Sequence, residues 1–152
     1  MSVQDRLTPE GRRFYQQLEE LAKMEVRIGY QAGEATDDRG VDICDIAAWN
    51  ELGTSGMPSR PFLRQTMDEH GDEITAFCKV QAAAIADGGS AETCLKRIGI
   101  FLKGLVQNQI TEGSFEPNAP STIKKKKSDK PLIDTGLMRE LVNYFIKQKG
   151  GG

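Results

Sequence analysis

The side chains that could carry out chemistry are few in this sequence and lie far apart. His70 is the only histidine, and no residue near it stands at a metal-ligand spacing. The acidic pairs Asp37-Asp38 and Asp42-Asp45 could hold a divalent ion for nuclease-like hydrolysis. They fall at the end of a polar loop and in the first turn of an expected helix, where carboxylates also favour the helix dipole. We therefore expect no catalytic residue and no metal site.

The cysteines Cys44, Cys78 and Cys94 are expected to be ordinary core thiols. Their number is odd, no two stand at CxxC spacing, and each falls within an apolar helical pattern. The sequence also contains no P-loop, no GxGxxG stretch and no GxSxG elbow. These patterns predict a protein that has no cofactor and is not an enzyme.

The one basic cluster is the run from Lys124 to Lys127. No aromatic residue lies among these lysines, so a site that stacks nucleic-acid bases is not expected. Three interpretations stay open: a solvated loop, a contact with an acidic face of a neighbouring subunit or partner, or non-specific contact with the phosphates of passing DNA. The net charge of −2 does not point to nucleic acid as the partner of the whole chain.

Composition places the chain among globular proteins with a lean core. Its 152 residues suit a single domain (1–152), and 38 % of them are hydrophobic. No apolar run approaches the length that spans a membrane, and the polar first twenty residues do not resemble a signal peptide. We expect a protein that is made and kept in a cytoplasm, without contact with a membrane.

Hydrophobic periodicity predicts an α+β fold in which a small antiparallel sheet packs against several helices. The two strands are expected near 25–30 and 141–147, with the long helices packed on one face of the sheet. The Thr8-Pro9 pair should begin the N-terminal helix within 1–23, and His70-Gly71 is a weak point in a long helix. The other helices are expected from near Val41 to Gly53 and at about 62–86, 90–112 and 137–140.

Two of these helices have apolar faces that the sequence defines. In the helix that begins near Val41, the apolar stripe contains Ile43, Ile46 and Ala47, with Trp49 or Leu52 as a further member. The helix at 90–112 contains Gly99 and Gly104, each of which costs about 1 kcal/mol relative to alanine. We expect close approach of another backbone to offset that cost. Its apolar face should comprise Leu95, Ile98, Leu102, Leu105 and Gln109, backed by Cys94 and Phe101.

Three irregular segments, 31–40, 53–61 and 113–136, separate these elements. The last is longer than the loops usual in compact domains, and such loops are commonly functional. Apolar residues stand between the prolines of these segments, so the segments are either arms that become ordered on another chain or wrappings of the protein's own core. The apolar residues are Met57, Phe62, Phe115, Ile123, Leu132 and Ile133.

Two blocks of this sequence resemble a known family. Ile46 to Thr54 reads IAAWNELGT and Met57 to Arg64 reads MPSRPFLR, which is similar to the IAxxNExGT…IPxRPFLR stretch of phage and prophage neck and tail-completion proteins. Later, Pro117 to Thr122 (PNAPST) and Lys130 to Met138 (KPLIDTGLM) resemble that family's PNxPxTxxxKGxxxPLIDTGxL stretch. The blocks occur in the family's order, and the resemblance covers roughly residues 24–147.

Small departures from the family pattern occur within the second block. Ser128-Asp129 replaces a common lysine-glycine turn, and Leu137-Met138 replaces a polar-leucine pair. The N-terminal helix lies outside the resemblance. The resemblance implies a structural virion protein that joins head and tail as a ring, often six-fold, located in the virion neck or tail. Its partners would be further copies of itself and the neighbouring connector or stopper, tail terminator or tail tube proteins.

Two alternatives to this function remain, which are a tail terminator that caps the tube and a non-enzymatic nucleic-acid-binding protein. For the motif residues, two roles are open. Gly53 and Gly56 permit unusual backbone angles, Pro58 and Pro61 stiffen an extended path, and Asp134 to Gly136 forms a helix-capping turn. These features either build turns within the monomer or shape an intersubunit surface.

On the second interpretation, the residues at an interface with another subunit or partner are Trp49, Asn50, Gly53, Met57, Pro58, Arg60, Pro61, Phe62, Arg64, Phe115, Pro117, Asn118, Pro120, Ile123, Lys130, Pro131, Leu132, Asp134 and Gly136.

Overall fold

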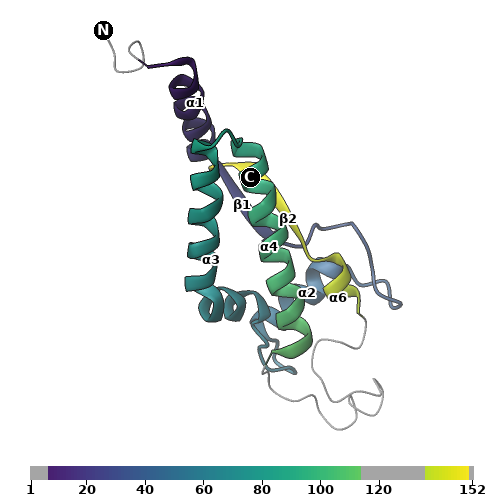
Figure 1. Ribbon diagram of the computed structural model, residues 1–152. Helices are drawn as coiled ribbons and strands as arrows, with labels where there is room; N and C mark the ends of the chain where they lie inside the picture. The colour runs from purple at the N-terminus through teal and green to yellow at the C-terminus, as the bar shows by residue number, and fades with distance from the viewer. Residues whose placement is uncertain (1–6, 114–135, 151–152) are drawn as a thin grey trace. The chain divides into compact units, whose positions relative to one another are not determined.

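The computed structural model describes residues 7–113 and 136–150. Within them the chain forms five helices and a two-stranded antiparallel sheet, which confirms the α+β class predicted from the sequence (Figure 1). The elements in chain order are α1 (Pro9–Lys23), β1 (Met24–Gly29), α2 (Ile43–Leu52), α3 (Phe62–Ala86), α4 (Ala91–Glu112), α6 (Leu137–Leu141) and β2 (Asn143–Gln148).

The chain divides into two compact units. Unit 1 comprises 1–27, 72–102 and 144–152, and unit 2 comprises 28–71 and 103–143. The boundaries fall inside α3, α4 and both strands, so each unit is assembled from segments that are distant in the sequence. In α3 the boundary lies next to His70, whose backbone angles are not helical. This kink confirms the weak point predicted at His70-Gly71.

In unit 1, α1 begins as predicted and is held by polar contacts. Thr8 Oγ1 accepts a hydrogen bond from the Gly11 amide at 3.1 Å, and Pro9 occupies the first helical turn. Arg13 donates to the Gly89 carbonyl at 2.9 Å, and the Gln17 side chain accepts from the Ala91 amide at 2.7 Å. No residue of α1 is buried. Hydrogen bonds to the turn between α3 and α4 therefore fix a helix that contributes little to a core.

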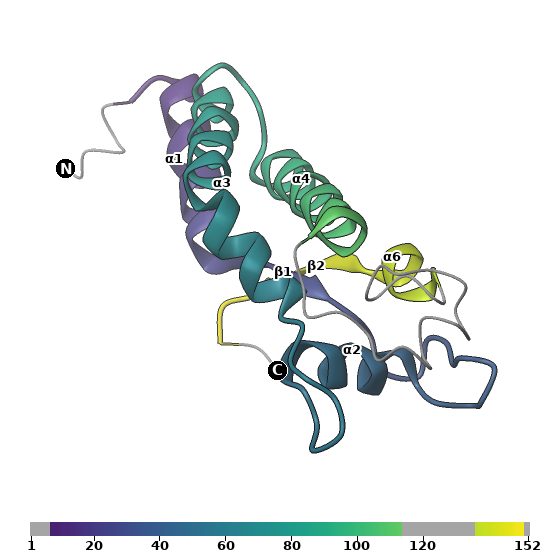
Figure 2. The same ribbon diagram turned by 90° about the horizontal axis from the view of Figure 1, so that it is seen from below.

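The α3 and α4 segments of unit 1 lie side by side and α4 also meets the sheet (Figure 2). The rings of Phe77 and Phe101 stack in parallel, with centroids 4.1 Å apart and planes 6° apart. Gly99 packs directly on the Tyr144 ring of β2, and a Cβ at this position would overlap that ring. The expected close approach of a backbone to Gly99 is therefore wrong, because a side chain fills the space. Nothing lies within 4 Å of a Cβ built at Gly104, so the prediction fails there too.

The core of unit 2 lies between α2, the first turns of α3, the end of α4 and α6. Phe62, Ile43, Val106 and Val142 are each fully buried in it. The predicted stripe of α2 is confirmed for Ile43, Ile46 and Ala47 but is wrong for the two further candidates. Trp49 is 44 % exposed and Leu52 is 76 % exposed. Both lie on the opposite side of α2 from the stripe, because the helical repeat rotates them away.

Other expectations differ from the structure by small shifts. In α4, Val106 and Ile110 are buried, whereas Leu105 is only half-buried. The last strand begins at Asn143 and not at Leu141. Leu141 is the last residue of α6, and Val142 is the C-cap residue of that helix. Strand β1 and helix α2 likewise begin one and two residues from their predicted starts.

The two α4 glycines provide a matched test of this packing. Gly99→Ala should destabilise the protein by roughly 1–3 kcal/mol because the new methyl group displaces the Tyr144 ring. Gly104→Ala should stabilise it by about 0.5–1 kcal/mol, because alanine favours the helix and meets open space. Urea unfolding of both variants measures the two changes. Equal effects at the two positions would contradict the packing of Tyr144 on α4.

Candidate functional site

The first of the two sequence blocks, residues 46–64, forms a corner between α2 and α3 in unit 2. The amide of Arg60 donates to the Asn50 carbonyl at 2.5 Å, and Ser59 Oγ donates to the Glu51 carbonyl at 2.7 Å. The amide of Gly53 donates to the Trp49 carbonyl at 2.8 Å and closes α2. The segment 53–61 is therefore tied back along its length to the last turn of α2.

Gly53 is required at this corner for two reasons. Its φ of +77° lies in the region that favours glycine, and a Cβ built there would lie 2.8 Å from the backbone nitrogen of Ser59. Any larger residue would push segment 53–61 away from α2. The glycine expected from the sequence to permit an unusual angle thus has that role within the monomer.

The side chain of Glu51 joins the two helices directly. Its Oε2 accepts from the Leu63 amide and its Oε1 from the Arg64 amide, both at 2.9 Å. These amides belong to the first turn of α3, where backbone donors lack helical partners and the helix dipole favours a negative charge. Glu51 is therefore the N-terminal cap of α3, supplied from another helix.

Glu51 is absent from the set of interface residues predicted from the sequence. The usual signal for a cap is a short polar residue directly before the helix, and here Pro61 stands there. The only sequence feature that could have pointed to Glu51 is its place in the Asn50-Glu51 pair of the first block. A contact between positions twelve and thirteen residues apart has no local sequence signature.

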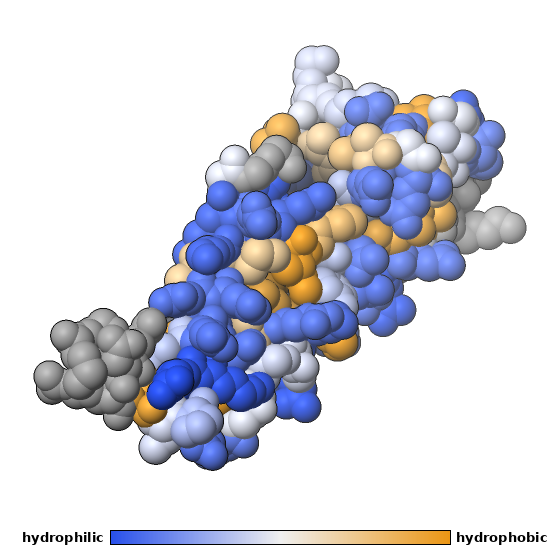
Figure 3. Space-filling view, turned by 90° about the horizontal axis from the view of Figure 1, so that it is seen from above, coloured by the Kyte–Doolittle hydropathy of each residue, from blue (hydrophilic) through white to orange (hydrophobic). Residues whose placement is uncertain are grey.

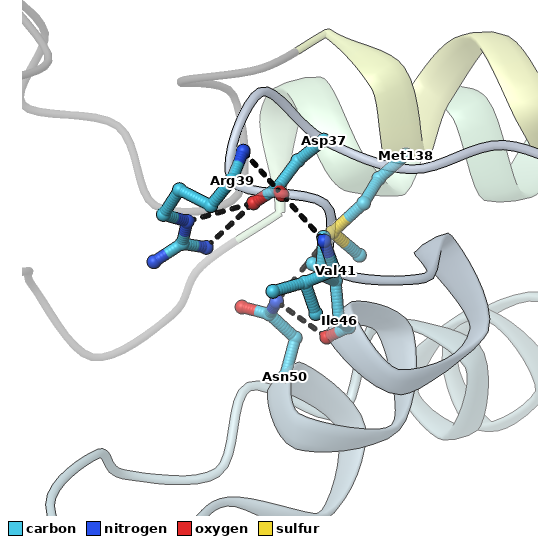
Figure 4. Close-up of polar contacts among 6 residues, drawn as sticks. All are labelled: Asp37, Arg39, Val41, Ile46, Asn50 and Met138. Atoms are coloured by element: carbon cyan, nitrogen blue, oxygen red, sulfur yellow. Dashed lines mark hydrogen bonds and ion pairs between the residues drawn. The ribbon is translucent and has the colours of Figure 1, made fainter.

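A second set of contacts ties the inner side of α2 to neighbouring segments (Figure 4). The Asn50 side chain donates to the Ile46 carbonyl at 2.9 Å and to the Met138 sulfur at 3.5 Å. The Tyr30 hydroxyl donates to the Met138 carbonyl at 2.6 Å. Burial raises the pKa of Tyr30 well above its usual value, and the nearby charge of Glu51 raises it further. Tyr30 thus remains a neutral hydrogen-bond donor.

The predicted interface residues that the structure describes divide by burial. Arg60 and Phe62 are 4 % and 0 % exposed, so their side chains offer no surface to a partner. This corrects the prediction of an intersubunit role for both: they belong to the monomer. Trp49, Pro58, Arg64 and Gly136 are exposed, and Asn50, Gly53, Met57 and Pro61 are half-buried.

The remaining predicted residues fall outside the described ranges 7–113 and 136–150. They are Phe115, Pro117, Asn118, Pro120, Ile123, Lys124, Lys125, Lys126, Lys127, Lys130, Pro131, Leu132 and Asp134. The expected capping turn is described only at Gly136. This residue precedes α6 with a φ of +64° and makes no side-chain cap.

One face of α2 is directed away from the core of unit 2. Asp45, Ala48, Trp49 and Leu52 recur at helical spacing and are all exposed. We call these four residues the α2 outer face. Leu52 has the largest exposed fraction among the large hydrophobic side chains of the described residues. The face is therefore acidic at its N-terminal end and apolar at its C-terminal end.

The acidic residues considered for metal-dependent chemistry organise the segment 31–42. Asp37 Oδ1 accepts from the Arg39 and Val41 amides, both at 2.9 Å, and Oδ2 pairs with the Arg39 guanidinium at 2.7 Å (Figure 4). These hydrogen bonds, that of Val41 above all, lower the pKa of Asp37. Asp42 accepts from the Gly33 amide at 2.6 Å and caps α2 through the Cys44 amide at 2.8 Å.

Unit 1 contains open apolar grooves. One, of about 400 Å³, is lined mainly by apolar side chains of α3, α4 and β1, together with Cys78 and Cys94. A second, of about 300 Å³, shares Met24 and Leu95 with it and has charged residues at its rim. Figure 3 shows hydrophobic surface (orange) exposed between hydrophilic side chains (blue) on one face of the molecule. Burial raises the pKa of both thiols, and the charge of Cys78 adds to the rise at Cys94, so neither is activated as a nucleophile.

Comparison with known proteins gives no match for this chain. No family model, no curated protein and no solved structure is similar to it. Within residues 7–113 and 136–150, no three histidine, cysteine or acidic side chains are grouped so as to hold a metal ion. No helix in the same residues combines the length and the apolar character needed to cross a membrane.

The Glu51 cap can be tested by stability measurements. Glu51→Ala should lower the free energy of unfolding by about 1–2 kcal/mol, because two amides of α3 lose their acceptor. Glu51→Gln keeps one acceptor oxygen and should have an intermediate effect. Glu69→Ala, at an exposed position of α3, is the matched control and should change stability by less than about 0.5 kcal/mol. An Ala variant as stable as this control would exclude the cap.

Acid titration tests the role of Asp37. Because its pKa is lowered from 3.8 in the folded state, its contribution to stability is present above that value and is lost as pH falls through the folded pKa. Asp37→Asn should therefore be less stable than the wild type at pH 7, and the difference should shrink below about pH 4. Thermal unfolding across this range measures the difference, with the exposed Asp38→Asn as control. A difference independent of pH would contradict this role.

Proposed function

We propose that this chain is a structural subunit of a tailed bacteriophage particle, which completes the neck or tail by forming a ring at the junction of head and tail. The observation that supports this function best is the exposure of Trp49 and Leu52 on the α2 outer face. Tryptophan is prominent among the residues that dominate protein interfaces. A helix that exposes such residues on a well-fixed scaffold suits assembly with other chains.

The hydrogen bonds behind this face are consistent with the same proposal. Glu51, Asn50 and Gly53 fix the last turn of α2 to segment 53–61 and to α3. The exposed apolar side chains therefore stand on a helix held at both ends, since Asp42 caps its beginning. A surface that is ordered before it binds loses little conformational entropy on assembly. The first block that resembles the phage family thus fixes this helix and also supplies Ala48, Trp49 and Leu52 of its outer face.

The acidic and thiol groups favour a structural role over a catalytic one. Asp37 and Asp42 accept hydrogen bonds from backbone amides, which is the use expected of carboxylates that order a loop. The thiols of Cys78 and Cys94 have raised pKa values, which lowers the fraction of reactive thiolate. These groups are therefore assigned to the stability of the monomer and not to a reaction.

A ring arises when one surface of a subunit binds a different surface of the next and the rotation closes. We assign the α2 outer face as one such surface, because Trp49 and Leu52 are exposed on it. The proposed partners are further copies of the chain in a ring, often six-fold, and the connector, stopper, terminator or tube proteins that adjoin it. The proposed location is the virion.

Electron microscopy of a lysate tests the function. A phage that carries this gene with an early stop codon should yield filled heads and tails of normal length that remain separate, because the junction is missing. A phage complemented with the wild-type gene is the control and should yield joined particles that contain the protein. Tails of uncontrolled length would instead assign the chain as a tail terminator. Intact infectious particles from the stop-codon phage would refute the structural role.

A further inference from the structure

We propose that the α2 outer face is the docking site for residues 122–133 of a second copy of this chain. This inference rests on the proposed function, because it requires copies to lie beside one another in an assembly. It adds to that function the identity of the two surfaces that meet. The receiving surface lies in unit 2, and the segment that binds it contains the lysine run.

The receiving surface changes from acidic to apolar along the helix. Asp45 stands at its N-terminal end, Trp49 near its middle and Leu52 at its C-terminal end. Leu52 follows Asp45 by seven positions, which is about 10 Å along the helix axis. A ligand that fits this face therefore needs a cation and an apolar group about 10 Å apart.

The described part of unit 2, to which this face belongs, is acidic in composition. The described residues of unit 2 contain ten aspartates and glutamates but only five lysines and arginines. Three of the carboxylates, those of Asp37, Asp42 and Glu51, are used by backbone amides. The other seven are exposed, namely Glu34, Asp38, Asp45, Asp68, Glu69, Glu112 and Glu140. A basic partner is therefore favoured over an acidic one such as DNA.

The sequence of residues 122–133, TIKKKKSDKPLI, has the complementary chemistry. It contains five lysines and one aspartate, with Ile123 before the lysines and Leu132-Ile133 after them. From Lys130 to Ile133, an extended chain spans about 10 Å. In such a chain Lys130 and Leu132 project on the same side, so Lys130 can meet Asp45 while Leu132 covers the apolar part of the face at Trp49 and Leu52. The remaining lysines then meet the exposed carboxylates that precede α2.

We assign this segment to a second copy because a contact between copies is what the proposed assembly requires. Its flanking residues Gly113 and Gly136 adjoin Ile110 and Met138, which lie in the core that the inner stripe of α2 also enters. The α2 outer face is on the opposite side of the helix from that stripe. Binding between copies also gives the contact of unlike surfaces that closes a ring.

Photo-cross-linking of the purified full chain tests the contact. Copies that carry benzoylphenylalanine in place of Leu52 are mixed at high concentration with copies labelled by a heavy nitrogen isotope. Mass spectrometry should then identify cross-links from position 52 of the unlabelled copy to residues 122–133 of the labelled copy. The same photoreactive residue in place of Ile100, an apolar position of α4 that is 61 % exposed, is the matched control and should not capture this segment.

A charge swap tests the pairing of Asp45 with Lys130. Asp45→Lys in the photoreactive copy should lower the yield of the cross-link about fivefold, and Lys130→Asp in the labelled copy should restore it. Circular dichroism checks that both variants remain folded. Loss without restoration would overturn the pairing of these residues.

Three other results would overturn the proposal: cross-links only within one copy, capture of other segments, or equal capture from position 100. All three results come from the purified chain and do not depend on whether phage particles assemble. Intact particles from the stop-codon phage would instead refute the proposed function and leave the cross-link between copies unaffected.

Discussion

The interaction on which the rest of unit 2 depends is the capping of α3 by the carboxylate of Glu51. One side chain near the end of α2 satisfies two amides in the first turn of α3, so the direction of one helix fixes the start of the other. Phe62 enters the core at that same turn. Because a buried aromatic side chain and a helix cap must be placed together, segment 53–61 has little freedom, and Gly53 provides the one backbone angle that permits its path.

Helix α2 consequently separates two roles on its two sides. Ile43, Ile46 and Ala47 supply core, while Asp45, Trp49 and Leu52 supply exposed surface of mixed character. Caps at both ends hold the helix between these environments. Burial of the apolar side chains on the inner side of α2 contributes to the free energy of folding. The side chains on its outer side make no such contribution, so a partner can contact them without a loss of monomer stability. This arrangement is consistent with the proposed assembly of several copies.

Unit 1 is held together by a different set of contacts. Its α1 has no buried residue and is tied to the α3–α4 turn through Arg13 and Gln17. The contact of Tyr144 with Gly99 brings β2 against α4, and the stacked rings of Phe77 and Phe101 bring α4 against α3. These local contacts leave open apolar grooves between the helices and β1. These pairs of side chains, together with the buried Ile85, Cys94 and Leu95, define the arrangement of this unit.

The sequence by itself determined the type and order of the elements, because helix caps, breakers and periodicity act over a few residues. Thr8-Pro9, Gly53, His70-Gly71 and the alternation of β1 predicted their elements to within about two residues. Only the tertiary structure showed that Glu51 caps α3, that Tyr144 fills the space beside Gly99, and that Phe62 and Arg60 are turned inward while Trp49 is exposed. Each of these depends on residues brought together from distant parts of the chain. Local propensity carries no information about such encounters, since they are fixed by how whole elements pack.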